Sequence, residues 1–101
     1  MNSTQSETAS GVVQTLTGVR EELQERFSVV RIGVFGSFAR GDETPDSDVD
    51  IIVEFAEPTF DHYMDLKFRL EEVLQRPVDL VMADTLKPRL KPIIEREVVY
   101  A

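Results

Sequence analysis

Residues 34–53 read VFGSFARGDETPDSDVDIIV, and this segment carries the strongest structural signal in the sequence. The apolar run at residues 32–35 predicts a buried strand, which Gly36-Ser37 interrupts. Residues 38–40 can form a first helical turn, and a polar, acidic loop follows at residues 41–47. The segment therefore predicts a strand that turns sharply into a short helix.

A second strand is predicted over residues 47–55, and it carries two carboxylates. Asp48 and Asp50 alternate there with Val49 and Ile51. Residues two apart on a strand project from the same face, so the carboxylates can converge on one cation while the apolar side chains enter the core. Such a pair suits Mg²⁺, which takes one or two carboxylates together with substrate phosphates.

The Gly36-Ser37 turn suits a phosphate, because a turn from a strand into a helix exposes backbone N–H groups. The Ser37 hydroxyl adds a donor, and Arg40 follows closely enough to hold phosphate oxygens with a charged fork. A Gly-Ser turn alone is usually only a turn, and two aspartates alone are often a solvated face. A phosphate cradle and metal ligands on adjacent strands together predict nucleotide chemistry.

The spacing of these residues resembles a known signature. Gly36-Ser37, ten intervening residues and Asp48-Val49-Asp50 are similar to the motif of the DNA polymerase β-like nucleotidyltransferase superfamily. The extended form, GSFARG followed by SDVDIIV, most resembles its minimal members, the MNT-type antitoxins encoded beside HEPN-domain toxins. The resemblance covers roughly residues 10–100 and implies a nucleotidyltransferase palm-like fold.

The resemblance also implies a reaction and a role for each motif residue. Such an enzyme would move AMP from ATP to an acceptor hydroxyl (AMPylation), with pyrophosphate leaving. Asp48 and Asp50 would hold Mg²⁺, which neutralises the triphosphate. Gly36 and Ser37 would bind the β- and γ-phosphates, and Arg40 would steady that end of the nucleotide.

Asp79 is the odd residue in a third predicted strand, the apolar run Val78–Met82. A carboxylate inside an apolar strand is costly unless it is paired or bound to a metal. One interpretation is an aspartate on an edge strand that faces water. In the resembled superfamily, however, a third acidic residue on a neighbouring strand completes the site, and Asp79 matches that position. It would hold a second metal ion or accept the proton of the acceptor.

Apolar residues at three- and four-residue spacing predict two long amphipathic helices. The first ends at Phe27, and the first strand follows at residues 28–35. The second starts after the cap residue Thr59 and ends near Arg76. The single histidine, His62, stands near the start of this helix and is interpreted as an exposed surface residue without a catalytic role.

The C-terminal segment predicts a final helix over residues 86–97 with Pro88 in its first turn. Pro92 indicates that the helix begins or kinks at that point instead. Residues 98–100 are apolar enough to add a short strand. The order α-β-β-α-β-α predicts an α/β (α+β) fold with a small mixed sheet and helices packed on one face. We expect a single domain over residues 1–101, of which residues 1–8 are flexible.

The net charge of −8 argues against direct nucleic-acid binding, which usually rests on a basic face. A cluster of Lys87, Arg89 and Lys91 is interpreted mainly as a solvated face, although it could attract a triphosphate or a partner. A basic protein partner is easier to reconcile with the charge. The sequence has no cysteine, no apolar run of membrane-spanning length and no signal-peptide pattern, so a cytoplasmic location is expected.

Larger members of the superfamily carry a helical domain that helps to bind base and acceptor, and nothing in the sequence corresponds to it. This difference favours an acceptor on another protein, a tyrosine of a HEPN toxin. Two alternatives stay open. One is a non-catalytic antitoxin that neutralises its toxin by contact, and the other is an enzyme that modifies a small molecule such as an aminoglycoside.

Overall fold

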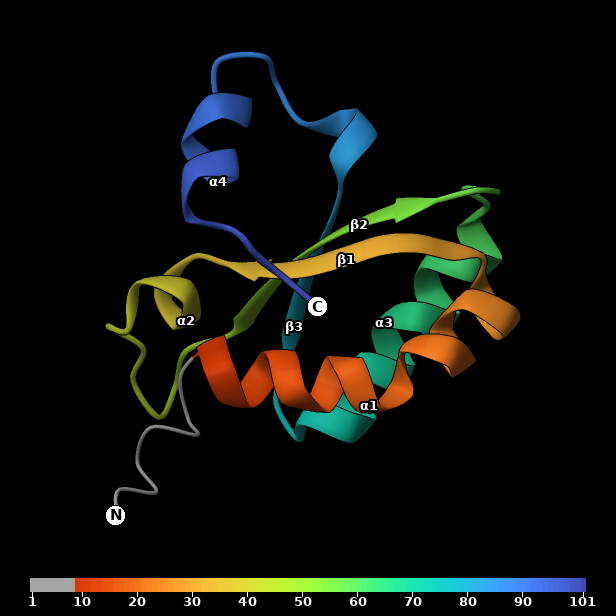
Figure 1. The fold of residues 1–101 in the computed structure, drawn as a ribbon, viewed down its shortest axis with the longest axis horizontal. Coiled ribbons are helices and arrows are strands. Elements are labelled where there is room, and N and C mark those ends of the chain that lie inside the picture. The colour runs from red at the N-terminus through yellow and green to blue at the C-terminus, as the bar shows by residue number, and fades with distance from the viewer. Residues whose placement is uncertain (1–8) are drawn as a thin grey trace.

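The strands β1 (Val29–Phe35) and β2 (Val49–Phe55) form the centre of a four-stranded sheet in the order β3-β2-β1-β4 (Figure 1). The structure is a computed structural model that describes residues 9–101. The expectation that residues 1–8 are flexible lies outside the described residues. Both central strands are rich in apolar residues and are bounded by turns, as predicted from the sequence.

The sheet is mixed, because its three strand pairs differ in direction. β1 runs antiparallel to β2, with Phe35 opposite Asp50. β3 (Val78–Met82) runs parallel to β2, with Asp79 beside Asp50. The two-residue strand β4 (Val99–Tyr100) pairs antiparallel with the outer edge of β1, which confirms the short C-terminal strand. This register brings the C-terminal end of β1 and the N-terminal ends of β2 and β3 together at one end of the sheet.

The helices α1 (Ala9–Phe27) and α3 (Phe60–Leu74) cover one face of the sheet, as predicted (Figure 1). Their apolar stripes pack on the strand residues that point towards them, so the core lies between this helical layer and the sheet. The fully buried side chains of this core are Leu16, Leu23, Ile32, Val34, Val49, Ile51, Val53, Leu66 and Leu70.

Alternation along β2 directs the remaining residues to the opposite face of the sheet. Val49, Ile51 and Val53 belong to the core, so Asp50 and Ile52 point the other way. This second face is partly covered by the C-terminal segment of the chain (Figure 1). Within residues 9–101, no helix is both long enough and apolar enough to span a membrane.

The C-terminal segment differs from the prediction. No continuous helix runs from residue 86: the chain forms a short 3-10 helix, η2 (Ala83–Thr85), and α4 begins only at Lys91. Pro92 stands in the first turn of α4, where its missing N–H leaves no hydrogen bond unmade. The alternative that the helix begins near Pro92 is therefore correct, and α4 (Lys91–Glu97) lies on the side of the sheet away from α1 and α3 (Figure 1).

Candidate active site

The site begins at Gly36, where β1 turns into the four-residue helix α2 (Ser37–Arg40). Gly36 has a φ of 74°, a conformation that side chains with a Cβ rarely adopt. A Cβ at this position would also overlap Oδ2 of Asp50. Glycine is thus required at this position for two reasons, and its small size lets the turn lie directly against Asp50. The predicted helical turn at residues 38–40 is confirmed.

Asp50 and Asp79 are neighbours across the parallel pair β2–β3. Partial burial is the main cause that raises the pKa of Asp50, and the charges of Asp79 and Asp48 raise it further. Arg40 acts in the opposite direction and lowers the pKa. The structure therefore brings the two other predicted carboxylates, Asp48 and Asp79, within electrostatic range of Asp50.

Asp48 lies outside the second strand, contrary to the prediction of a strand over residues 47–55. β2 begins at Val49, and Asp48 is an exposed residue at the end of the preceding loop. Strand alternation therefore does not orient Asp48, although its charge still acts on Asp50.

Asp79 is exposed and lies on β3, which is an edge strand of the sheet. Asp79 therefore does not pay the cost of burying a lone carboxylate, which was the reason to single it out in the sequence. Asp79 therefore fits both interpretations of its position: it is an aspartate on an edge strand that faces water, and it is also an acidic residue beside Asp50. Its position next to Asp50 means that the two carboxylates could share a cation.

The donor set fits Mg²⁺, but only in part. Among residues 9–101, no three acidic or histidine side chains are gathered closely enough to form a ready-made cation site. Mg²⁺ needs only one or two carboxylates when phosphates supply further oxygens. The repulsion around Asp50 is what a cation between Asp50 and Asp79 would relieve. The residues thus fit a metal that arrives with its nucleotide.

Arg40, the predicted phosphate ligand, is held between two carboxylates. Its Nε donates to Asp42 Oδ2 at 3.3 Å, and its Nη1 donates to Glu97 Oε1 at 3.2 Å. These contacts raise the pKa of Arg40, that to Asp42 more than that to Glu97. The backbone N–H of Gly36 donates to the other oxygen, Glu97 Oε2, at 3.2 Å. A carboxylate therefore contacts two of the groups that were predicted to hold a phosphate.

Glu97 was not identified from the sequence, where it was only the last residue of a predicted helix. The signal that locates it is the pairing of β4 with β1, in which Tyr100 stands opposite Gly33 and Val99 opposite Val34. Glu97 is the last residue of α4, and β4 begins two residues later, so this pairing brings the end of α4 to the Gly36 turn. The pairing depends on tertiary structure and is not visible in a local pattern.

His62 plays no part in this site. Its Nδ1 lies 2.7 Å from the Glu57 carbonyl oxygen, and its ring stacks on Phe55 with the centroids 6.4 Å apart. Phe55 is the last residue of β2, at the far end of the strand from Asp50. The histidine is half-buried rather than exposed, and it joins the start of α3 to the end of β2.

Comparison with known proteins agrees with this geometry. The profile of the nucleotidyltransferase domain family matches residues 16–101, so the chain belongs to this family. Protein adenylyltransferase MntA of Thermococcus cleftensis is 46% identical over 94 residues, which are 92% of this chain and 95% of that protein. The predicted enzyme class, nucleotidyltransferase, is confirmed.

Solved structures show the same fold. The structure of a candidate minimal nucleotidyltransferase superposes with a TM-score of 0.71 at 40% identity, and the match covers 86% of this chain and 93% of that one. A Shewanella oneidensis complex of a tri-AMPylated HEPN toxin with an MNT antitoxin contains a chain with a TM-score of 0.63 at 20% identity. That match covers 88% of this chain and 70% of the other, and it shows likeness of fold alone.

Proposed function

We propose that this chain is a protein adenylyltransferase that moves AMP from ATP to a hydroxyl of a HEPN-type toxin, and that it acts as the antitoxin. The observation that supports this most is the contact between Gly36 and Asp50, because a turn suited to a phosphate then lies against Asp50 and its neighbour Asp79. The name of the Thermococcus cleftensis relative supports the protein acceptor. The proposed reaction consumes ATP, which fits the expected cytoplasmic location.

The triphosphate end of ATP would lie at α2. Helix α2 leaves the N–H groups of its first turn without partners in the helix, and its first residue, Ser37, carries a hydroxyl. These groups would bind the β- and γ-phosphates next to Gly36. Arg40 would exchange a carboxylate partner for phosphate oxygens, which it can hold with two parallel hydrogen bonds.

The carboxylates would act on the α-phosphate. Asp48, Asp50 and Asp79 would hold magnesium, which neutralises the triphosphate and stabilises the attacking and leaving oxygens when bound. Asp79 is exposed, so it could also take the proton of the acceptor hydroxyl. An acceptor that approaches Asp79 from the open edge of the sheet would meet the phosphate on the side away from α2.

The acceptor we propose is a tyrosine on a separate chain. A docked protein would exclude water from an open site and would hold the attacking oxygen close to the phosphate. The net charge of −8 suits the attraction of a basic partner over long range. Solved relatives with the same fold include a toxin–antitoxin complex with AMP-PNP, which motivates both the partner and the nucleotide.

Intact mass spectrometry of the toxin after incubation with this chain, Mg²⁺ and ATP tests the proposal. We expect the toxin mass to increase by one or more AMP groups, located on tyrosine by peptide mapping. Asp50→Asn should lower the rate by about 10²-fold or more, because a metal ion contributes several kcal/mol to such reactions. Asp65→Asn is the matched control, since Asp65 is exposed on α3 in the helical layer.

Two results would contradict the proposal. If the Asp48→Asn/Asp50→Asn protein silences the toxin as well as wild type does, and without ATP, inhibition is by contact alone. If labelled AMP appears on an aminoglycoside and not on the toxin, the enzyme acts on a small molecule. Either result would leave the family assignment intact. The first would remove the catalytic role of the chain, and the second would replace the acceptor.

A further inference from the structure

Arg76 lies where three segments that carry residues of the candidate site meet. Its Nη1 donates to the carbonyl oxygens of Pro45 at 3.1 Å and Ser47 at 3.2 Å, in the acidic loop that leads to Asp48. Its guanidinium carbon lies 5.1 Å from the centroid of the Phe38 ring, which is buried on α2. Arg76 itself stands two residues before β3. One side chain therefore joins α2, the acidic loop and the entry to β3.

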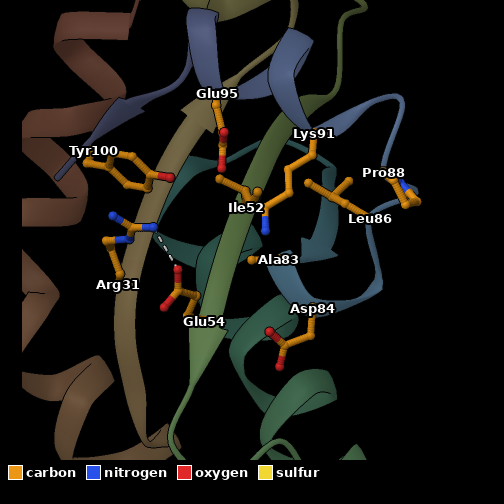
Figure 2. A pocket seen from close by; sticks show the side chains of 10 residues that line it. All are labelled: Arg31, Ile52, Glu54, Ala83, Asp84, Leu86, Pro88, Lys91, Glu95 and Tyr100. Carbon is orange, nitrogen blue, oxygen red and sulfur yellow. Dashed lines mark hydrogen bonds and ion pairs between the residues drawn. The ribbon is translucent and has the colours of Figure 1, made fainter.

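The partners of Arg76 differ from those of the arginines that form ion pairs. Figure 2 shows Arg31 at the edge of a cavity of about 480 Å³ over Ile52, where a dashed line marks its pair with Glu54 at 2.7 Å. Arg76 lies beside an acidic loop, yet within residues 9–101 its guanidinium forms no ion pair and donates to backbone carbonyls alone. Such bonds fix the course of the backbone rather than the position of another side chain.

The loop that Arg76 contacts is also closed by its own hydrogen bonds. The Ser47 N–H donates to the Thr44 carbonyl at 3.0 Å, and the Thr44 N–H donates to Ser47 Oγ at 2.8 Å. These bonds make residues 44–47 a compact turn, and Arg76 binds the carbonyls of its second and last residues. The whole turn is thus tied to the segment that enters β3.

Asp48 stands between two fixed backbone groups, although it belongs to the loop. The Ser47 carbonyl before it accepts from Arg76. The Val49 N–H after it donates to the Pro77 carbonyl at 3.0 Å. Pro77 also restricts the backbone of Arg76, because a residue before proline is disfavoured in the helical region. Residues 76 and 77 therefore hold the backbone on both sides of Asp48.

The same segment sets the position of the third carboxylate. Asp79 follows Pro77 by two residues on β3 and lies beside Asp50. A displacement of residues 76–77 would therefore move Asp48 and Asp79 relative to Asp50, which stands on the inner strand β2. Mg²⁺ demands near-ideal octahedral geometry with oxygens at about 2.0–2.1 Å, so a small displacement of its ligands weakens binding.

We propose that Arg76 is a positioning residue for the metal of the transfer reaction: it holds the Asp48 backbone where the carboxylates of Asp48 and Asp50 can share a cation. The proposal rests on the proposed function, which assigns Mg²⁺ to these carboxylates. Arg76 acts through the loop backbone and has no assigned contact with the nucleotide or the metal. The loss of Arg76 should therefore change the demand of the site for Mg²⁺.

Calorimetric titration with α,β-methylene-ATP at several Mg²⁺ concentrations tests this role. The analogue cannot be cleaved at the bond that breaks in the proposed reaction. Arg76→Gln shortens the side chain and removes both bonds to the loop. The Mg²⁺ requirement is the concentration at which the binding constant of the analogue reaches half of its limiting value. We expect Arg76→Gln to raise it about tenfold, the lower end of the usual cost of removing a group that orients a metal ligand.

Arg69→Gln is the matched control, because Arg69 is also a half-buried arginine but forms its bonds in the helical layer. It donates to both carboxylate oxygens of Glu22 on α1, at 2.9 and 3.0 Å, and to Glu72 at 2.9 Å. We expect Arg69→Gln to lower the melting temperature without changing the Mg²⁺ requirement. If it raises the Mg²⁺ requirement as much as Arg76→Gln does, the effect of Arg76 is a general loss of stability and the proposal is wrong.

Amide hydrogen exchange gives a second readout that needs neither nucleotide nor metal. We expect Arg76→Gln to speed the exchange of the Ser47 and Val49 N–H groups, whose hydrogen bonds belong to the loop and its junction with β3. Exchange in α1 should stay as in the wild type. Exchange that becomes faster throughout α1 as well would indicate global opening and would overturn the proposal.

Arg76→Lys takes the place of Arg76→Gln if the latter does not fold. Lysine keeps the charge, but its ammonium stands one bond short of Nη1, so we expect a smaller rise in the Mg²⁺ requirement. An unchanged requirement in Arg76→Gln, or in Arg76→Lys where only that variant folds, would overturn the proposal and leave the proposed function standing. If the wild-type chain binds the analogue at no Mg²⁺ concentration, the proposed function fails, and the role of Arg76 fails with it.

Discussion

At the scale of single residues, contacts from two carboxylates fix the turn at Gly36, which we propose binds phosphate. Gly36 has no side chain because Asp50 occupies the space where one would stand. Glu97 fixes the same turn from the other side, through the Gly36 N–H and Arg40. The Glu97 side chain is only 22% exposed, so its charge is poorly screened by water. A triphosphate arriving at α2 would meet this carboxylate.

We expect Glu97→Gln to strengthen Mg–ATP binding about threefold to tenfold. One negative charge several ångströms from a phosphate costs on the order of 1 kcal/mol near a protein surface, and the amide would no longer compete for Arg40. Isothermal titration calorimetry would measure the change. Glu21→Gln is the control, since Glu21 is exposed on α1 in the helical layer. Weaker binding by Glu97→Gln would show that Glu97 positions Arg40 rather than competing with the nucleotide.

At the scale of elements, Glu71 joins α3 to the edge strand that carries Asp79. Its Oε2 accepts hydrogen bonds from the Val78 N–H at 2.9 Å and from Lys67 Nζ at 3.0 Å. The Val78 bond is the main cause that lowers the pKa of Glu71 below its ordinary value of 4.5, and Lys67 lowers it further. An acid with a lowered folded-state pKa stabilises the fold above its unfolded pKa, and this stabilisation is lost as pH falls through the folded value.

Urea unfolding of Glu71→Gln at several pH values tests this contact. At pH 7 we expect the variant to lose about 1 kcal/mol of unfolding free energy, the scale of one partly exposed hydrogen bond to a charged group. The difference from wild type should narrow as the pH falls below 4.5. Asp65→Asn on the same helix is the control, because no hydrogen bond or ion pair of its side chain occurs within residues 9–101. A difference that stays constant with pH would contradict the assignment.

The elements also show how far the sequence could be read. Three strands were predictable, because a short apolar run between turn residues usually forms a buried strand. They are Val29–Phe35, Val49–Phe55 and Val78–Met82. Thr59 caps α3 as its residue type indicates, accepting from the His62 N–H at 3.0 Å. The start of α4 was not predictable in the same way. Its sequence carries two prolines, at positions 88 and 92, and each suits a first helical turn.

The residues of the candidate site also fall into two groups, those that a local sequence motif identifies and those that only the tertiary structure identifies. Gly36 and Asp50 follow from a short motif whose spacing is local in the sequence. The role of Glu97 follows only from the β1–β4 register, and the cavity over Ile52 only from the position of α4. Both depend on contacts between residues far apart in the chain. Periodicity carries no information about such contacts until the sheet order is known.

At the scale of the whole molecule, the net charge is −8. Many of the arginines are engaged with carboxylates within residues 9–101: the pairs involve Arg26, Arg31, Arg40 and Arg69. The local cluster of Lys87, Arg89 and Lys91 lies around the start of α4, and Lys91 lines the cavity. Too few cations are left together to follow a polynucleotide backbone.

We therefore expect this chain to bind neither DNA nor RNA appreciably on its own. Polynucleotide affinity arises mainly from the release of counterions by lysine and arginine, and it falls steeply as salt rises. Fluorescence anisotropy with labelled single- and double-stranded oligonucleotides should give dissociation constants weaker than about 10⁻⁴ M at physiological salt, with a shallow salt dependence. Lys87→Glu/Arg89→Glu should change this little. A steep linear fall of log affinity with log salt, abolished by that double substitution, would instead identify the start of α4 as a nucleic-acid contact.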